Sequence, residues 1–131
     1  MKAYITCPVS HSNKRLNVLP IIEKIVKNNG IDTFVFQIGG NPKEIFKRDE
    51  KQLKSCSLII AEVSERSHGV GIELGMAYES GLKAILLIEK GRFITKLAQG
   101  MPNTKIIEYK NIEDLKNKLN SYLRKIKCPK R

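Results

Sequence analysis

Aromatic residues are scarce in this sequence. It has no tryptophan, and its four tyrosines and four phenylalanines make up 6% of the 131 residues without forming a cluster. Proteins that bind single-stranded nucleic acids combine a basic groove with aromatic side chains on which the bases stack. The net charge of +11 would attract phosphorylated ligands, nucleic acid or an anionic membrane. Because the chain lacks an aromatic cluster and a known binding motif, a nucleic-acid binder ranks last among the functions considered.

Cysteines are also few, and no two of the three have the spacing of metal ligands (Cys7, Cys56 and Cys128). We therefore expect neither a metal site nor an organic cofactor. An odd number of free thiols indicates a reducing compartment, and Cys7 and Cys56 are expected to be small buried apolar residues. No signal peptide is recognisable before the first strand, and no apolar run approaches the roughly 20 residues of a membrane span. These absences predict a cytoplasmic protein that does not contact a membrane.

Short apolar runs alternate with amphipathic segments along the whole chain, without repeats or low-complexity linkers. The predicted strands cover residues 2–6, 32–37, 58–63, 84–88 and 106–109, and the predicted helices cover 19–29, 42–55, 72–80, a short piece within 91–99, and a last helix from 111. Such alternation predicts a single α/β domain over residues 1–131, with a basic tail at 126–131 that frays. Right-handed crossovers favour a three-layer flavodoxin-like (Rossmann-like) fold with a five-stranded parallel sheet in the order 2-1-3-4-5.

Local signals place individual residues on these elements. Pro20 is tolerated only in a first helical turn, and Asn41 followed by Pro42 predicts an N-cap and the first residue of a helix. On that helix, Phe46 is expected on the inner side. Most basic residues, including Arg15, are expected on solvated helix faces.

One stretch stands out, because the apolar run 58–61 is followed by a polar turn with two glycines and then by a predicted helix from Ile72. A strand, a glycine turn and a helix in this order direct backbone N–H groups at an anion. Glu73 lies at the start of this helix, where the helix dipole favours its ionised form. A carboxylate in a first turn is more often a dipole partner than a nucleophile, and a lone Gly-x-Gly is weak evidence, so both readings stay open from this stretch alone.

With these positions placed, the chain resembles the nucleoside 2-deoxyribosyltransferase superfamily, and within it the 2′-deoxynucleoside 5′-monophosphate N-hydrolases. The resemblance covers residues 4–109, and its most specific parts are Ala-Glu-Val-Ser at 61–64 and Ser-His-Gly-Val-Gly-Ile-Glu-Leu-Gly at 67–75. It implies that Glu73 is the nucleophile that attacks the anomeric carbon. It also implies that Asp49 is the second carboxylate and that Tyr4 orients the nucleophile. An oxocarbenium-like transition state can be stabilised and trapped by one carboxylate while another protonates the leaving base.

The same resemblance gives the phosphate contacts. Ser67, His68, Gly69 and Gly71 follow the hydrolase pattern, and Thr95 replaces a hydrolase serine that reaches the phosphate of the partner subunit. The transferase asparagine falls on Ile94, which favours a phosphorylated substrate. The first loop departs from the family pattern because it lacks the usual glycines and arginine. Ser10 and Ser12 are candidates for the missing contacts.

These observations predict an N-glycosidase that hydrolyses nucleoside 5′-monophosphates and acts as a homodimer with a shared active site. The alternatives are a nucleoside 2-deoxyribosyltransferase that exchanges bases and a nucleotide-binding module without turnover.

Overall fold

The chain folds into alternating strands and helices, described by a computed structural model for residues 1–10 and 12–127. The elements are β1 (Lys2–Thr6), a 3-10 helix η1 (Lys14–Val18), α1 (Leu19–Asn28), β2 (Asp32–Val35), α2 (Pro42–Ser55), β3 (Leu58–Glu62), α3 (His68–Glu79), β4 (Lys83–Glu89), α4 (Lys96–Gln99), β5 (Thr104–Tyr109) and α5 (Ile112–Lys127). Residues 128–131 of the predicted basic tail, with Cys128, lie outside the described residues. Within the described part of the chain, no helix is long and apolar enough to cross a membrane.

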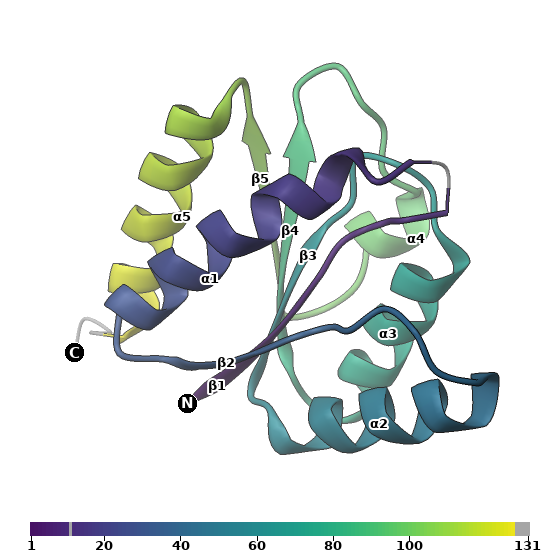
Figure 1. Cartoon of the computed structure of the whole chain (residues 1–131). Helices are drawn as coiled ribbons and strands as arrows, with labels where there is room; N and C mark the ends of the chain where they lie inside the picture. The colour runs from purple at the N-terminus through teal and green to yellow at the C-terminus, as the bar shows by residue number, and fades with distance from the viewer. Residues whose placement is uncertain (11, 128–131) are drawn as a thin grey trace.

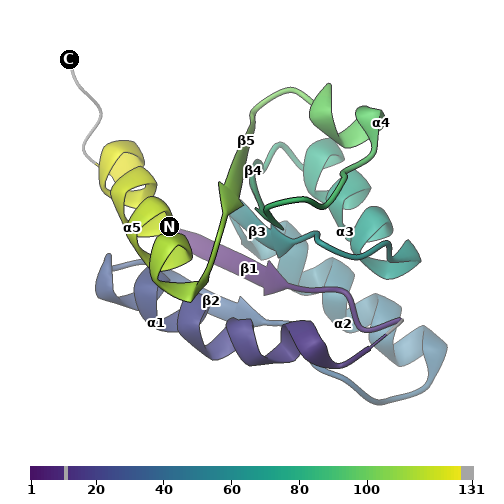
Figure 2. The ribbon, with the colours of Figure 1, turned by 90° about the horizontal axis from the view of Figure 1, so that it is seen from above.

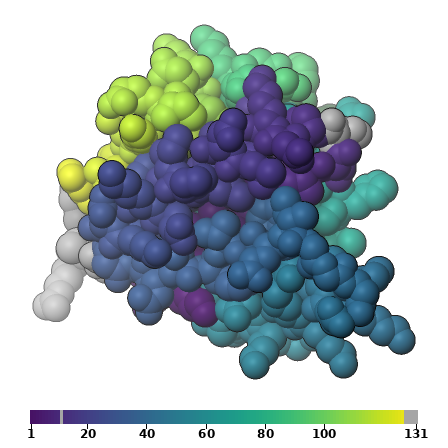
Figure 3. Space-filling model, viewed as in Figure 1, coloured from purple at the N-terminus to yellow at the C-terminus, as the bar shows by residue number. Residues whose placement is uncertain are grey.

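The five strands form one parallel sheet in the order β2-β1-β3-β4-β5. Helices α1 and α5 cover one face of the sheet, and α2, α3 and α4 cover the other (Figures 1 and 2). In the space-filling view, α1 and the segment from β2 through α2 make up much of the visible face (Figure 3). The predicted three-layer flavodoxin-like fold and strand order are confirmed. The chain reverses its winding direction between β1 and β3, and at such a point ligands bind beyond the carboxyl ends of the strands.

Alternation along β1 divides its side chains between two cores. Ala3 and Ile5 belong to the core under α1 and α5, whereas Tyr4 belongs to the core under α2 and α3. Both cores extend across β3 and β4, whose central residues are fully buried as expected for a covered parallel sheet. Tyr4 pairs in register with Ile59 of β3 and Phe34 of β2, so it lies in the middle of the sheet.

Two predicted helix starts are confirmed. Pro20 lies in the first turn of α1. Asn41 caps α2, accepting a hydrogen bond from the backbone N–H of Glu44 at 2.9 Å. Cys7 and Cys56 are buried free thiols, as predicted.

Other local predictions are wrong. Helix α3 begins at His68, not at Ile72, because Ser67 caps it by accepting from the N–H of Val70 at 3.3 Å. Both glycines of the predicted turn therefore lie in the helix. Phe46 is 50% exposed, because its side chain lines the open cleft and is not packed in the core.

Arg15 was expected on a solvated face but is only 3% exposed. Its Nε donates to Glu65 at 3.0 Å and its Nη1 donates to Glu89 at 2.7 Å, while Glu62 lies 4.0 Å away. Burial acts to lower the pKa of Arg15, but the hydrogen bonds to Glu89 and Glu65 outweigh it and leave the net pKa raised. The guanidinium thus joins η1 to the carboxyl ends of β3 and β4.

Glu62 is the centre of the same polar network, and its side chain is fully buried. It accepts hydrogen bonds from the Tyr109 hydroxyl and from the backbone N–H and hydroxyl of Ser64, both at 2.7 Å. The Ser64 hydroxyl in turn accepts from the N–H of Glu89 at 2.8 Å. Three neighbouring strands are therefore tied together beneath the turn that leads into α3.

Removing the Tyr109 hydroxyl should destabilise the protein. Tyr109→Phe leaves a buried carboxylate with one donor fewer, so we expect the free energy of unfolding to fall by about 1–3 kcal/mol. The matched control is Tyr122→Phe, on a half-buried ring that Lys83 and Lys105 approach from solvent, where the change should stay within about 0.5 kcal/mol. Urea denaturation measures the free energy of unfolding of both variants. Equal losses of stability in the two would contradict the role given to Glu62.

Candidate active site

Two hydroxyl groups from β1 meet one carboxylate from α3. Residues i and i+2 of a strand point to the same face, so Tyr4 and Thr6 both face α3. The Tyr4 hydroxyl donates to Oε2 of Glu73, and Thr6 Oγ1 donates to Oε1 at 3.0 Å. Each carboxylate oxygen thereby has its own donor, which fixes the orientation of the group.

The helical period explains why a carboxylate is directed inward. The buried side chains of α3 are Val70, Glu73, Leu74 and Ala77, which recur at the spacing of one helix face. Glu73 is 8% exposed and lies in the second turn of α3, because the helix begins four residues before the predicted start.

Burial sets the protonation of Glu73. It raises the pKa of Glu73 to about 7, the hydrogen bonds from Tyr4 and Thr6 lower it, and the negative charge of Asp49 raises it further. Loss of hydration is the largest of these effects, so the pKa of Glu73 lies above its ordinary value in spite of its two donors. Burial and the neighbouring Glu73 raise the pKa of Tyr4, so its hydroxyl remains a donor. A carboxyl group with a pKa near 7 is typical of sites that handle protons or covalent intermediates.

Glu73 and Asp49 line the same cleft, which has a volume of about 450 Å³. The cleft lies beyond the carboxyl ends of β1 and β2, with α2 on one side and α3 on the other, as the topology predicts for a ligand site. Thr6 and Cys7 form part of its floor. Burial raises the pKa of Cys7 to about 12, so its thiol stays protonated. This volume is within the range of small-molecule sites.

Asp49 is buried, and its nearest partner is the preceding residue. Arg48 Nε donates to Oδ1 of Asp49 at 3.1 Å. The same guanidinium donates to the carbonyl oxygens of Gln37 at 2.6 Å and Gly39 at 3.3 Å. Arg48 therefore fixes both Asp49 and the loop after β2. That loop requires glycine, because Gly39 and Gly40 have φ angles of +104° and +109°.

The N-terminus of α3 forms another part of the cleft wall. Ser67 and Gly69 line the cleft, and the first N–H groups of a helix have no intrahelical acceptor. Ser67 Oγ accepts from Val70, and no other described residue accepts from the N–H groups of His68 and Gly69, which are therefore open to a ligand. A methyl group on Gly69 would meet only Ser67 Oγ, at 3.8 Å. Glycine here leaves space beside the N–H groups without any need for an unusual backbone.

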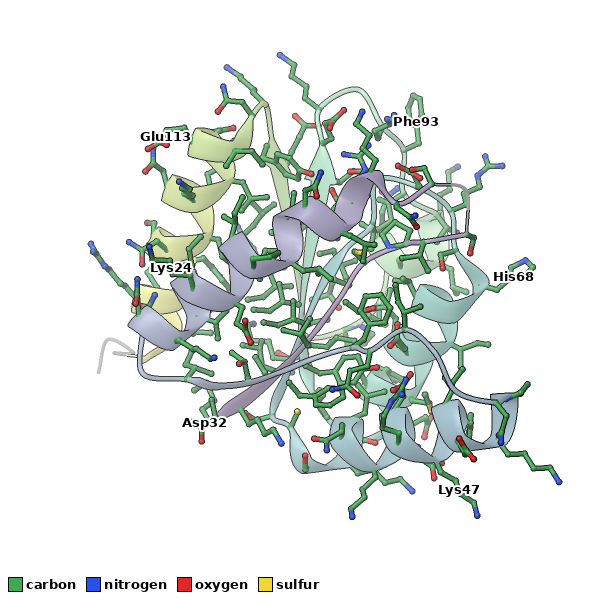
Figure 4. All side chains as sticks on the ribbon, viewed as in Figure 1. Lys24, Asp32, Lys47, His68, Phe93 and Glu113 are labelled. Atoms are coloured by element: carbon green, nitrogen blue, oxygen red, sulfur yellow. The ribbon has the colours of Figure 1, made fainter. Side chains whose placement is uncertain are left out.

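The remaining predicted contacts lie elsewhere. His68, Gly71 and Thr95 line a neighbouring hollow of about 540 Å³ that shares Ser67 and Val70 with the cleft. His68 points away from the body of the molecule, as does Phe93 (Figure 4). Thr95 caps α4 by accepting from the N–H of Leu97 at 3.3 Å.

In the loop after β1, the two serines predicted to contact the substrate lie outside the cleft. Ser10 is exposed, and Ser12 donates to Glu65 at 3.2 Å. Neither serine lines the cleft or the neighbouring hollow.

Sequence reasoning missed Thr6 and the network of Arg15 and Glu62. Thr6 has a simple signal, because a hydroxyl two residues after Tyr4 on a strand must face the same way. Glu62 has a weaker one, since a carboxylate that ends a fully apolar strand is expected to need buried partners.

No protein-family model matches the chain. A protein of Thermofilum pendens, named "Putative 2'-deoxynucleoside 5'-phosphate N-hydrolase 1", is 26% identical over an alignment of 136 residues, which covers 94% of this chain and 95% of that protein. This similarity extends over nearly the full length of both proteins.

Two solved structures share the fold. A CMP N-glycosidase from Clostridium botulinum superposes with a TM-score of 0.77 at 23% identity and covers 93% of this chain and 99% of that one. A 2-deoxyribosyltransferase from Bacillus psychrosaccharolyticus gives a TM-score of 0.68 at 18% identity over 94% and 96% of the two chains. Together with the sequence match, they confirm the predicted resemblance to the nucleoside 2-deoxyribosyltransferase superfamily. The chain is thus similar in sequence to a protein named as an N-hydrolase, and in fold to a CMP N-glycosidase and a 2-deoxyribosyltransferase.

The raised pKa of Glu73 predicts a specific dependence of stability on pH. A group with a pKa near 4.5 when unfolded and about 7 when folded binds more protons in the folded state. Stability is therefore lost as the pH rises from about 4.5 to 7. Glu73→Gln removes this loss, so it should be more stable than the wild type at pH 8, by about 1–3 kcal/mol, and no more stable at pH 4. Thermal unfolding at both pH values measures the difference, and a constant difference would contradict the raised pKa.

Proposed function

We propose that this protein is an N-glycosidase that hydrolyses 2′-deoxynucleoside 5′-monophosphates to the free base and deoxyribose 5-phosphate. The observation that carries the proposal is the Glu73 carboxylate, held by two hydroxyl donors in the wall of a cleft that also contains Asp49. The similarity to the Thermofilum pendens protein named as an N-hydrolase supports the same chemistry.

In the proposed reaction, Glu73 attacks the anomeric carbon of the sugar. The bond from that carbon to the base breaks, and its electron pair leaves with the base nitrogen. Asp49, from the other side of the cleft, must carry a proton when the substrate is bound, and it gives this proton to the departing base. Tyr4 and Thr6 hold the attacking carboxylate in place. Water then attacks the anomeric carbon and gives a proton to Asp49. The bond to Glu73 breaks, its electron pair returns to the carboxylate, and the sugar phosphate is released.

The 5′-phosphate would bind at the N-terminus of α3. The free N–H groups of His68 and Gly69 and the hydroxyl of Ser67 are donors that suit an anion there. We further propose a homodimer in which Thr95 of the partner subunit reaches the same phosphate. Exposed Phe93 and Leu97 flank Thr95 on each chain, which supports an interface at this surface.

Base exchange is the second candidate function, since a deoxyribosyltransferase shares the fold. The two functions differ in the acceptor of the glycosyl group. A hydrolase uses water, whereas a transferase needs a second base. Incubation with and without an added free base therefore separates them.

The direct test uses a panel of ribo- and deoxyribonucleoside 5′-monophosphates, with free base detected by chromatography. We expect release of base without an added acceptor, and a loss of at least about a hundredfold in Glu73→Gln. Because Glu73→Gln is expected to fold at least as stably as the wild type above neutral pH, loss of folding cannot explain the result. Wild-type rates in this variant would contradict the mechanism. Nucleotide binding without release of base from any substrate would indicate a binding module.

The role of Asp49 predicts a dependence on the leaving group. Asp49→Asn cannot donate a proton, so it should slow release of natural bases by about a hundredfold or more. It should slow release of an activated base, which leaves without protonation, far less. The test is to measure, for a natural and for an activated substrate, how far Asp49→Asn lowers kcat relative to the wild type. Equal slowing of both would assign Asp49 to binding or orientation.

The proposed phosphate site predicts a contrast between two glycines of α3. Gly69→Ala places a methyl group beside the free N–H groups and should weaken monophosphate binding by at least about tenfold. Gly75→Ala, in the same helix, would meet nothing within 4 Å and should leave binding unchanged. Both variants should fold normally. Calorimetric affinities for a deoxynucleoside and its monophosphate provide the test, and unchanged phosphate preference in Gly69→Ala would contradict the site.

A further inference from the structure

One end of the cleft is chemically different from the end that holds the carboxylates. On α2, Ile45 and Phe46 precede Asp49 by four and three residues, so the three side chains share one face of the helix and all line the cleft. If Asp49 protonates the leaving base, the base must lie against this face. The edge of the base that points away from the sugar then meets Ile45 and Phe46.

The loop after β2 provides the facing wall with Phe36 and Ile38. This wall is held in place, because Arg48 binds the carbonyl oxygens of Gln37 and Gly39 on either side of Ile38. Its apolar surface is therefore a fixed part of the site. Gln37 is the one uncharged polar side chain of this loop that lines the cleft.

Three large apolar side chains remain open to solvent around the cleft. Ile38 is 64% exposed, Ile72 is 57% exposed and Phe46 is 50% exposed, and all three line it. A ligand that covers them gains the free energy of removing apolar surface from water. A polar group in the same position would lose its hydrogen bonds to water with few replacements.

On these grounds we propose that the enzyme prefers nucleotides whose base carries an apolar substituent on its outer edge, with Ile38 and Phe46 as the residues that determine the preference. The inference rests on the proposed function, because it uses the position of Asp49 to orient the base. It adds to that function the class of base that the site accepts. Recognition of this edge then depends on apolar contact more than on hydrogen bonding.

Pairs of substrates with equal size and different polarity test the preference. N6-propyl-dAMP and N6-(2-hydroxyethyl)-dAMP form one pair, and 5-ethyl-dUMP and 5-hydroxymethyl-dUMP form another. In at least one pair we expect kcat/KM to be about tenfold higher for the apolar member, since a buried methyl group replaces an unpaired hydroxyl. The kcat/KM of the apolar member of that pair should also be higher than that of the unsubstituted nucleotide, by about fourfold for each buried methylene.

Variants of the cleft assign the preference to residues. Ile38→Ser and Phe46→Ser change exposed positions and should fold normally. Each should reduce the kcat/KM ratio of the apolar to the polar member by at least about threefold. The matched control is Gln37→Ala on the same loop, which should leave the ratio unchanged. Sedimentation of each variant shows whether the oligomeric state has changed.

Each outcome decides between the two proposals. Equal kcat/KM for the two members of each pair would overturn the inferred preference. So would a kcat/KM ratio that falls only in Gln37→Ala. Either result would leave the proposed glycosidase activity standing. A change of oligomeric state in Ile38→Ser and Phe46→Ser with unchanged ratios would assign the apolar residues to a subunit interface and also overturn it. No release of base from any nucleotide would refute the proposed function itself, and the inference with it.

Discussion

The buried carboxylate of Glu73 and its two hydroxyl donors are the interaction on which the site depends. Desolvation alone would leave this group neutral or expel it from the interior. Tyr4 and Thr6 counter that cost by giving one donor to each oxygen, which also joins β1 to α3. The result is a carboxyl group whose pKa of about 7 lies far above its ordinary value. It can ionise near neutral pH and become a poorly hydrated, well oriented nucleophile.

The carboxyl ends of the other strands hold a second polar cluster of a different kind. There Arg15 bridges Glu65 and Glu89, and Glu62 is enclosed by the groups around it. This cluster faces α1 and fixes the turn before α3, whereas Glu73 faces the open cleft. On one side of the sheet the buried charges of Arg15 and Glu62 fix the connecting loops. On the other side the buried carboxylate of Glu73 lines the cleft as a candidate reactive group.

The sequence predicted the sheet and its strand order, because these depend on apolar periodicity. Four of the residues that it singled out line the cleft, namely Asp49, Ser67, Gly69 and Glu73. Its predictions were wrong where the environment of a residue depends on tertiary packing. Arg15 has the sequence context of an ordinary helix-face cation, but three carboxylates at and after the ends of β3 and β4 surround it. Phe46 has an apolar side chain at a helical spacing, but it lines the open cleft and is half exposed. The start of α3 was misplaced because two glycines mimic a turn, although neither has a positive φ.

The chemical role of Glu73 is tested most directly by trapping the glycosyl-enzyme. The protein would be mixed with a 2′-fluorinated arabino-nucleoside 5′-monophosphate, which slows hydrolysis of the intermediate, then quenched and digested for mass spectrometry. A covalent mechanism predicts one fluorinated sugar phosphate per active site, attached to the peptide that contains Glu73. Release of base with no adduct at any time, or an adduct on another residue, would contradict nucleophilic attack by Glu73.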